Sequence, residues 1–509
     1  MIQQEIFDLS MGLAMSSSQA PHSSCLGMRF QRRLHRQKLY IRKRAGQLWR
    51  FVKKLRVRLF LGGRSGRNRV VASEQHQAPA PAPAPGGGEC STPSRKNPRN
   101  KIKIVKKSTS ILFEEVQAPA GEWSLIPGLP HDVALQCLAR VPRVEHCLLR
   151  AVCRSWRWIV ETPDFVEQRR LLGCAEDWLY LHVGTSPHLD ERRDRDGSSK
   201  RGSSSGGKWQ LVGGFSLWHA LDPYRYKWHA LPPIPYDESV TGGQVVLGAT
   251  SVVMNGNLFV IGGAPFGKAA IRDVWVYNPL RNRWKRAAQM ITPRFACLAA
   301  TIKGKLYVIG GSGICHLTGY SLPCLEVYNP KTDSWSYKAS ARGIVTAHPC
   351  SPLKYIAVVD DKLCVIGPQS VTGRINAGMY DPESDSWLEI KPGLRSGWGK
   401  ASTVMDGLLY TLDFGCYQQY VAEKDSWLPV KGKNADSLLE WDPRLVSAMA
   451  GSNGKLYMVG TMGPALIVVI APVRGGKVNQ NVCWHTMKLP NGVDFLGDLG
   501  HCSCQVITF

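Results

Sequence analysis

Residues 301–335 read TIKGKLYVIGGSGICHLTGYSLPCLEVYNPKTDSW and contain the pattern that decides the fold. The segment KLYVIG, which is rich in β-branched and aromatic residues, is typical of a short buried strand. Gly310-Gly311 follows it, and glycine lets the backbone turn through conformations that residues with a Cβ resist. LEVY predicts a second strand, and Asn329-Pro330 predicts the turn that leads to a third strand at Trp335.

The same order of features recurs along the chain. GNLFVIGG at 256–263 is followed by VWVYNPLRNRW, which ends at Trp284. In four units a Tyr precedes a Trp by 7 residues, and in a fifth unit Leu221 replaces this Tyr. The Trp residues of successive units are separated by 56, 51, 52, 40 and 57 residues, at positions 228, 284, 335, 387, 427 and 484. A recurring unit of this length is typical of kelch blades, which have a period of about 50 residues.

Over about residues 178–509 the chain therefore resembles the kelch family, which implies a mainly β fold. One blade cannot bury both faces of its sheet, so the blades must stack in a ring. The units predict a six-bladed β-propeller whose blades end near the six Trp positions. The first unit offers three strands, at 178–183, 215–222 and 227–231, whereas residues 502–509 (CSCQVITF) alternate like a strand without a partner. We expect this C-terminal strand to complete the first blade and to close the ring.

A different pattern precedes the propeller, at residues 122–173. Pro130 suits the first turn of a helix, and Asp132 complements the positive end of the helix dipole. Apolar residues then continue over short helical segments until Thr162-Pro163. About fifty residues of this kind form a marginal core by themselves, and surplus apolar surface usually marks a docking face.

The ordered pattern L-x-P-x-L-P-x-D, then C-L-x-R-V, then L-x-x-V-C-x-x-W resembles the F-box family. Members of this family pack a small helical bundle onto Skp1, the adaptor of cullin-based ubiquitin ligases. The alternative is an ordinary helical hairpin that caps the propeller. The combination of F-box and kelch repeats is abundant in plants, which favours a plant source. By resemblance, the contact with Skp1 would use Leu125, Pro127, Leu129, Pro130, Asp132, Leu135, Leu138, Val141, Leu149, Val152 and Trp156.

The net charge of +25 is concentrated in the N-terminal quarter. Residues 29–69 contain 16 Lys or Arg and no Asp or Glu, and apolar residues at about 46–61 follow helical spacing. Such a segment suits an anionic membrane, nucleic acid, a partner's groove, a nuclear import signal or an organelle transit peptide, and it also suits a disordered basic tail. We expect residues 1–121 to be a disordered arm that includes a Pro/Gly linker at 78–88, and nuclear import is the function that we favour for it.

No feature of the sequence indicates secretion, a membrane span or catalysis. Glu5 and Asp8 stand where a secretory signal needs basic residues, and apolar runs stop far short of about 18 residues. We expect an intracellular protein of the nucleus, the cytoplasm or both, with reduced thiols. The sequence has no P-loop, GxSxG or HExxH motif, and Cys502-x-Cys504 lacks a second pair at zinc-like spacing. We therefore predict no enzyme activity, catalytic residue, cofactor or metal.

Loops at the rim of a propeller are held by a rigid scaffold and commonly bind partners. Two arginines suit carboxylates or other anions, and other loop residues suit stacking or apolar contacts. Each of them is also compatible with packing between blades, whereas we assign the recurring Trp284, Trp335 and Trp387 to structure. The candidate target-binding residues are Phe266, Arg294, His316, Arg342, Arg374 and Trp398.

These patterns together predict a substrate receptor of an SCF-type (Skp1–cullin–F-box) ubiquitin ligase. The F-box would dock a Skp1-like adaptor, and through it a cullin, while the propeller holds a target protein. The alternative is a protein that binds nucleic acid or an anionic membrane surface through residues 29–69. A third possibility, an enzymatic kelch ring, lacks the necessary ligands in the sequence.

Overall fold

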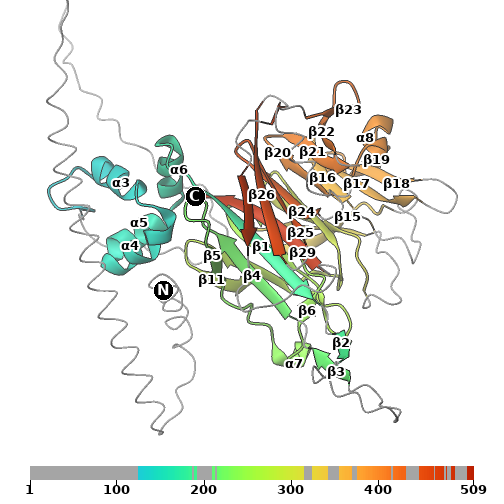
Figure 1. The fold of residues 1–509 in the computed structure, drawn as a ribbon, viewed down its shortest axis with the longest axis horizontal. Helices are drawn as coiled ribbons and strands as arrows, with labels where there is room; N and C mark the ends of the chain where they lie inside the picture. Colours follow the sequence, from blue (N-terminus) through green and yellow to red (C-terminus); the bar gives the residue numbers. More distant parts are fainter. Residues whose placement is uncertain are drawn as a thin grey trace, which may run out of the picture.

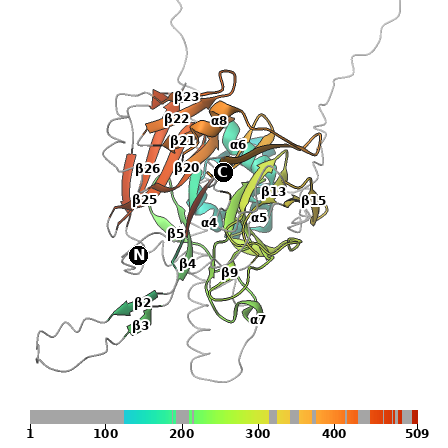
Figure 2. The ribbon, with the colours of Figure 1, turned by 90° about the vertical axis from the view of Figure 1, so that its right-hand side faces the viewer.

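The computed structural model describes residues 124–185, 188–191, 209–212, 215–313, 324–341, 353, 355–369, 375–399, 401–413, 416–430, 446–462, 465–474, 477–478, 483–487 and 501–509. The expected N-terminal arm and its basic segment lie outside these residues. A helical module at 124–173 comes first and is followed by a ring of β-sheets (Figure 1). When the molecule is turned by 90°, helices α4 to α6 lie behind the propeller (Figure 2).

The ring has six blades, and the strands of each blade are antiparallel. Strands are given from the inner to the outer edge of each blade, and blade 1 consists of β29 (His501–Thr508), β1 (Asp177–Thr185), β4 (Phe215–Leu221) and β5 (Trp228–Ala230). Blade 2 consists of β7 (Thr250–Met254), β8 (Asn257–Ile261), β10 (Val274–Asn278) and β11 (Arg283–Arg286). Blade 3 consists of β12 (Leu298–Ile302), β13 (Lys305–Ile309), β14 (Leu325–Asn329) and β15 (Ser334–Lys338). Blade 4 consists of β16 (Tyr355–Val359), β17 (Lys362–Gln369), β18 (Ile375–Asp381) and β19 (Ser386–Leu388). Blade 5 consists of β20 (Ala401–Met405), β21 (Leu408–Asp413), β22 (Cys416–Val421) and β23 (Ser426–Pro429). Blade 6 consists of β24 (Val446–Ser452), β25 (Lys455–Met462), β26 (Ala465–Arg474) and β28 (Cys483–Met487). The structure confirms the predicted six-bladed propeller.

The first blade combines strands from the two ends of the propeller sequence. β29 is antiparallel to β1, and the register runs from Asp177 opposite Thr508 to Gly184 opposite His501. The inner strands β29, β7, β12, β16, β20 and β24 contact one another in a closed cycle. The C-terminal strand thus closes the ring, and it does so by main-chain pairing with residues more than three hundred positions earlier in the chain.

A repeated side-chain cluster explains why Tyr and Trp recur at a fixed spacing. In blades 2 to 5 the third-strand Tyr lies opposite the fourth-strand Trp, and its hydroxyl donates to an Asn or Asp in the turn between them. In blade 4 the Tyr380–Asp385 bond is 2.7 Å, and the Asp385 carboxylate also accepts the main-chain N–H of Ala339 from the preceding linker. Trp387 donates its indole N–H to the carbonyl of Ala339. Each cluster therefore joins its blade to the linker from the previous one.

Four helices and one 3-10 turn make up the helical module: α3 (His131–Ala139), η3 (Arg143–Glu145), α4 (His146–Val152), α5 (Arg154–Val160) and α6 (Pro163–Leu171). Thr162 caps α6 by accepting the N–H of Phe165, and Pro163 occupies the first turn, as in many helices. Smaller elements decorate the propeller: the pair β2 (His188–Glu191) and β3 (Trp209–Val212), the pair β6 (Val246–Leu247) and β9 (Ala264–Pro265), β27 (Lys477–Val478), α7 (Glu238–Thr241) and α8 (Pro392–Ser396).

Candidate functional site

The apolar residues of the helical module build its own core. Trp156 is buried at the centre and donates its indole N–H to the carbonyl oxygen of Leu125 at 2.6 Å. Six of the eleven side chains predicted to contact an adaptor are buried in this core. They are Leu125, Leu129, Leu138, Val141, Leu149 and Trp156.

The other five predicted residues are accessible on the module. Pro127, Pro130 and Asp132 are exposed at the entrance to α3, and Leu135 and Val152 are half-buried on α3 and α4. Leu135 and Val152 pack against the core with part of their surface and leave the rest free. The module therefore has both a closed core and an outer surface with partly exposed apolar residues.

A buried arginine joins the module to the propeller. The guanidinium of Arg169, on α6, donates to the carbonyl oxygens of Ala139 and Val141, both at 2.6 Å, and to that of Phe509 at 3.2 Å. It also pairs with the carboxylate of Glu176 at 2.7 Å. Burial lowers the pKa of Arg169, but an arginine stays charged in proteins. One side chain thus links helices α3 and α6 with the C-terminal strand of the first blade.

Glu176 holds the propeller side of this junction. Its Oε1 accepts the main-chain N–H of Arg143 at 2.8 Å, and its Oε2 accepts the indole N–H of Trp178 at 3.0 Å. Glu176 and Phe509 also exchange two main-chain hydrogen bonds, which extend the pairing of β1 and β29. The contacts of Glu176 and Phe509 therefore both close the ring and attach the module to it.

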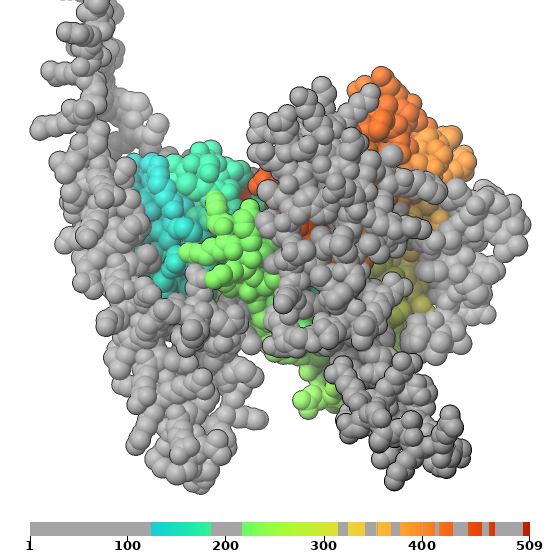
Figure 3. Space-filling view, viewed as in Figure 1, coloured from blue at the N-terminus to red at the C-terminus, as the bar shows by residue number. Residues whose placement is uncertain are grey.

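Further contacts reach the second blade. Glu161, at the end of α5, pairs with Arg150 of the module at 2.8 Å and with Arg281, in the turn between β10 and β11, at 3.0 Å. The guanidinium of Arg143 lies 4.7 Å from the ring centre of Phe509 and donates to the carbonyl oxygen of Pro279. The module, in cyan and teal, lies directly against this green part of the propeller (Figure 3).

The junction occupies one of the two faces of the propeller. Because the strands are antiparallel, the turns between strands one and two and between strands three and four lie at one end of each blade. We call this end the hairpin face, and the module contacts it at Phe509, Pro279 and Arg281. The opposite end, the linker face, carries the loops between strands two and three and the linkers between blades. Of the predicted target-binding residues, Phe266, Arg294 and Trp398 lie in described segments of the linker face.

Arg294 does not line the linker face as predicted, because its side chain is completely buried. It pairs with the equally buried Glu326 at 2.7 Å and donates to the carbonyl oxygens of Gly310 and Cys324. Its position after Thr292-Pro293 resembled an exposed loop in sequence, but the linker turns inward there. Arg294 therefore connects the second and third blades and is not free for a target.

Trp398 is also a packing residue. Its indole N–H donates to Ser402 at 2.9 Å, and its ring stacks on that of Tyr355 with centroids 6.4 Å apart. Phe266 is half-buried and keeps part of its surface on the linker face. Residues His316, Arg342 and Arg374, like the basic segment 29–69, lie outside the described residues.

Other predicted features can be compared with the described residues. Within them, no group of three or more His, Cys, Asp or Glu side chains could hold a metal ion. Nine cysteines of the described part of the chain, Cys137, Cys147, Cys153, Cys174, Cys297, Cys324, Cys364, Cys502 and Cys504, are free thiols. No helix among the described residues is long and apolar enough to cross a membrane.

Comparison with known proteins identifies both parts of the chain. The F-box domain model matches residues 126–168, and the FKB95 kelch-repeats domain model matches residues 216–481. The chain is a member of the F-box/kelch-repeat family. F-box/kelch-repeat protein At1g22040 of Arabidopsis thaliana is 30% identical over 430 residues, which cover 73% of this chain and 82% of the relative.

Two further relatives from Arabidopsis thaliana support the same assignment. F-box/kelch-repeat protein At1g16250 is 32% identical over 68% of this chain and 77% of its own length. F-box protein AFR is 27% identical over 57% of this chain and 68% of its own length. The helical module is thus the F-box of an F-box/kelch-repeat protein, and the relatives are plant proteins.

The sequence patterns did not lead us to predict two sets of structural residues. The Asn or Asp that follows each third-strand Tyr by five residues, as in DSW at 333–335 and 385–387, recurs with the Trp and could have been recognised from that repetition. Arg169 and Glu176 occur once, and nothing in the sequence relates them to Phe509.

Proposed function

We propose that this F-box/kelch-repeat protein recruits targets to an SCF-type E3 ubiquitin ligase. The F-box binds a Skp1-like adaptor, and through it a cullin, while the propeller binds a protein to be ubiquitinated. The observation that carries this proposal is the separation of two surfaces. The F-box is fixed to the hairpin face at blades 1 and 2, and its contacts leave the linker face uncovered by the module.

The adaptor surface that we propose consists of the accessible residues of the F-box. Pro127, Pro130 and Asp132 form its polar and proline-rich edge, and Leu135 and Val152 supply apolar contact area. Buried apolar area at the centre of an interface contributes most of the binding energy, while the exposed rim contributes little. Leu135 and Val152 are therefore the residues on which we expect affinity to depend most.

The mechanism is proximity, and it needs no catalytic side chain in this protein. A target held on the linker face is kept near a ubiquitin-loaded enzyme elsewhere in the complex, which raises the effective concentration of its lysines. This effect is larger when the connection is stiff. The buried contacts of Arg169 and the ion pairs of Glu161 provide such a connection between the F-box and the propeller.

The test is binding of purified Skp1 adaptor to two matched double variants. Leu135→Glu with Val152→Glu places charges on the proposed surface, and Leu388→Glu with Leu428→Glu places the same charges on exposed outer-strand positions of the propeller. We expect the first pair to lower affinity by about tenfold or more and the second to leave it unchanged. Equal affinity for both, with melting temperatures like the wild type, contradicts the proposed surface.

The cellular location of the protein and the role of its N-terminal arm are also part of this proposal. We propose that the protein acts in the nucleus, the cytoplasm or both, as expected for a ubiquitin ligase subunit. The alternative function, binding of nucleic acid or an anionic membrane, rests on residues 29–69, and no described residue and no comparison bears on it. A loss of salt-dependent retention on DNA or anionic vesicles when 29–69 is deleted would support that alternative.

A further inference from the structure

Five arginines lie across the boundary between the F-box and blade 2. Two of them, Arg150 and Arg281, pair with the carboxylate of Glu161 at 2.8 Å and 3.0 Å. The other three are exposed, and none of these three forms an ion pair with another described residue. We call the five the arginine ridge, and they are Arg150, Arg154, Arg157, Arg281 and Arg283.

The spacing of these residues makes the ridge continuous from the F-box to the propeller. Residues three and four positions apart lie on one side of a helix, so Arg154, Arg157 and Glu161 share one side of α5. Glu161 contacts Arg281 in the turn between β10 and β11, and Arg283 follows two residues later, about 7 Å along the strand. In Figure 1, β11 is on the side of the propeller that faces the F-box helices.

The ridge carries a surplus of positive charge. Burial lowers the pKa of Arg150, and the charge of Glu161 opposes this effect. The charges of Arg143 and Arg157 lower this pKa further, so the three guanidinium groups lie close together. Glu145, on the turn before α4, lies 3.8 Å from an arginine of blade 1 and has its own partner there. Because arginines stay charged in proteins, the single carboxylate of Glu161 leaves most of the ridge unneutralised. Such guanidinium groups suit carboxylates, which they can bind with two parallel hydrogen bonds.

The ridge begins next to the proposed adaptor surface. Val152, on which we expect adaptor affinity to depend, ends α4 two residues before Arg154. Its neighbours Ala151 and Cys153 are exposed as well, so the surface continues to Arg157 without a buried interruption at this point. The length of α5 adds only about 10 Å. An interface of standard size covers about 800 Å² on each partner, so one that includes Val152 can extend to blade 2.

We propose that an acidic segment of the Skp1-like adaptor lies along the arginine ridge, so that the adaptor contacts blade 2 as well as the F-box. This inference rests on the proposed function and adds a charged part to the adaptor surface. The apolar residues Leu135 and Val152 hold the adaptor, while the ridge speeds its association and orients it relative to the propeller.

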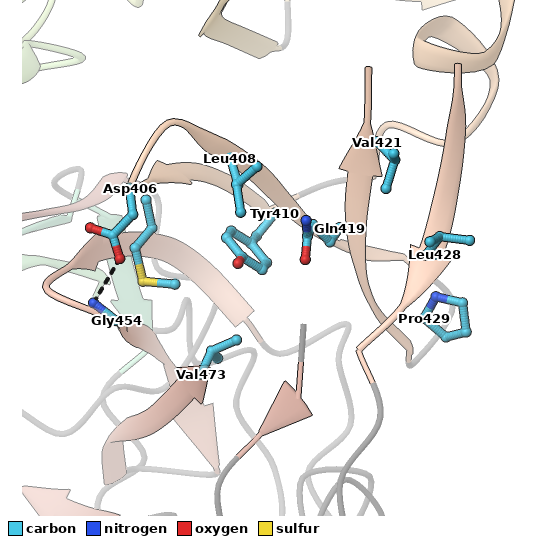
Figure 4. A pocket seen from close by; sticks show the side chains of 10 residues that line it. Asp406, Leu408, Tyr410, Gln419, Val421, Leu428, Pro429, Gly454 and Val473 are labelled. Carbon is cyan, nitrogen blue, oxygen red and sulfur yellow. Dashed lines mark hydrogen bonds between the residues drawn. The ribbon is translucent and has the colours of Figure 1, made fainter. Parts of the chain in front are cut away.

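A hollow of about 670 Å³ between blades 5 and 6 is a second place where a partner could contact the propeller (Figure 4). Its apolar lining includes Leu408 and Leu428, and Asp406 carries the charge of its lining. A carboxylate repels an acidic segment, so the hollow does not suit this part of the adaptor. Leu408→Glu, which adds a negative charge at an exposed position there, is therefore expected to leave adaptor binding unchanged.

The association and dissociation rates of purified Skp1 adaptor with the full chain test the proposal. Arg157→Glu with Arg283→Glu is expected to slow association about tenfold at low salt and less at high salt, because exposed charges act mainly on the association rate and are screened by salt. Arg283→Glu alone should slow it about threefold and isolates the contribution of blade 2. The matched control is Arg272→Glu with Lys424→Glu, an equal change of charge at exposed positions outside the ridge, and it should change the rate less than about twofold.

Arg283→Lys shows whether the contact is direct. A carbodiimide joins the lysine amine to a carboxylate that touches it, and mass spectrometry of the linked peptides then identifies the acidic segment of the adaptor. Arg272→Lys, on the linker face of the same blade, should give no link to the adaptor. Equal association rates for the ridge variant and its control, or no link from residue 283 in a complex that has formed, overturn the proposal while the proposed function stands. An adaptor that does not bind the wild type contradicts both.

Discussion

Arg169 and Glu176 form an ion pair of 2.7 Å in which the side chains are only 1% and 3% exposed. The pair lies where the last helix of the F-box, the first strand of the propeller and the C-terminal strand meet. Removing charges from water costs free energy, and the pair is tolerated because the remaining donors of the guanidinium bond to carbonyl oxygens. We infer that the pair favours one arrangement of the F-box against the propeller.

Replacing Arg169 by Met should destabilise the protein strongly. The change leaves the Glu176 carboxylate buried without its partner, which typically costs about 3–5 kcal/mol. Arg170→Met is the matched control, because Arg170 is the next residue and pairs with Glu167 at the surface. It should change the free energy of unfolding by less than about 1 kcal/mol. Denaturant unfolding measures both, and equal effects would contradict the role of the buried pair.

The hydrogen bond between Tyr380 and Asp385 should contribute measurably to the stability of the ring. Tyr380→Phe removes the hydroxyl without changing the ring, so the expected loss is about 1 kcal/mol. Tyr337→Phe removes a hydroxyl that bonds Thr292 at the exposed outer strand of blade 3 and serves as the control. Thermal unfolding should show a lower melting temperature for the first variant alone. An equal fall in melting temperature in both variants would mean that the Tyr380–Asp385 bond contributes no more to stability than an exposed hydrogen bond.

Asp385 should also contribute to the acid sensitivity of the propeller. Its hydrogen bond from Tyr380, and then that from the main chain of Ala339, lower the pKa of this carboxyl below its usual value. A depressed pKa in the folded state gives stability that is present above the unfolded pKa of about 4 and is lost as the pH falls through the folded pKa. Asp385→Asn should therefore show a smaller loss of melting temperature between pH 5 and pH 3 (about the range in which carboxyls titrate). If the melting temperature of Asp385→Asn fell with pH as steeply as that of the wild type, Asp385 would not contribute to the acid sensitivity.

His146 should make the F-box sensitive to milder acid. Burial, and then the charges of Arg143 and Arg169, lower its pKa well below the usual value, and its Nε2 bonds the carbonyl oxygen of Val141. Because the unfolded chain takes up a proton near pH 6.5 and the folded chain does not, stability falls as the pH drops below about 6.5. His146→Phe should reduce this loss, and His131→Gln, at an exposed position of the same module, should not. Melting curves at pH 7.5 and pH 5.5 (about one unit on either side of that pKa) would compare them.

The propeller could be predicted from the sequence because the residues that define a blade recur in several units of the chain. The Tyr and Trp seven residues apart mark the third and fourth strands of a blade, and the unpaired strand at 502–509 pairs with β1 in the structure. Blade 6 was visible in the sequence only as a weak form of the repeat. That Val469 stands opposite Trp484 needed the register of β26 and β28.

The candidate site was predicted less well, for a physical reason. In a module of about fifty residues the same apolar side chains are needed for the core, so a pattern of Leu, Val and Trp does not separate core from surface. Six of the eleven adaptor residues therefore proved to be buried. Arg294 was taken for an anion holder because its partner Glu326 is 32 residues away in sequence.

Hydrogen–deuterium exchange of the full chain, alone and bound to purified Skp1 adaptor, measures which surface the adaptor covers. We expect slower exchange in α3 and α4, around Leu135 and Val152, and unchanged exchange in the described linker-face segments 262–273 and 287–297. Protection of the linker-face segments, or no protection in the F-box of a complex that has formed, would show that the adaptor does not bind the proposed F-box surface.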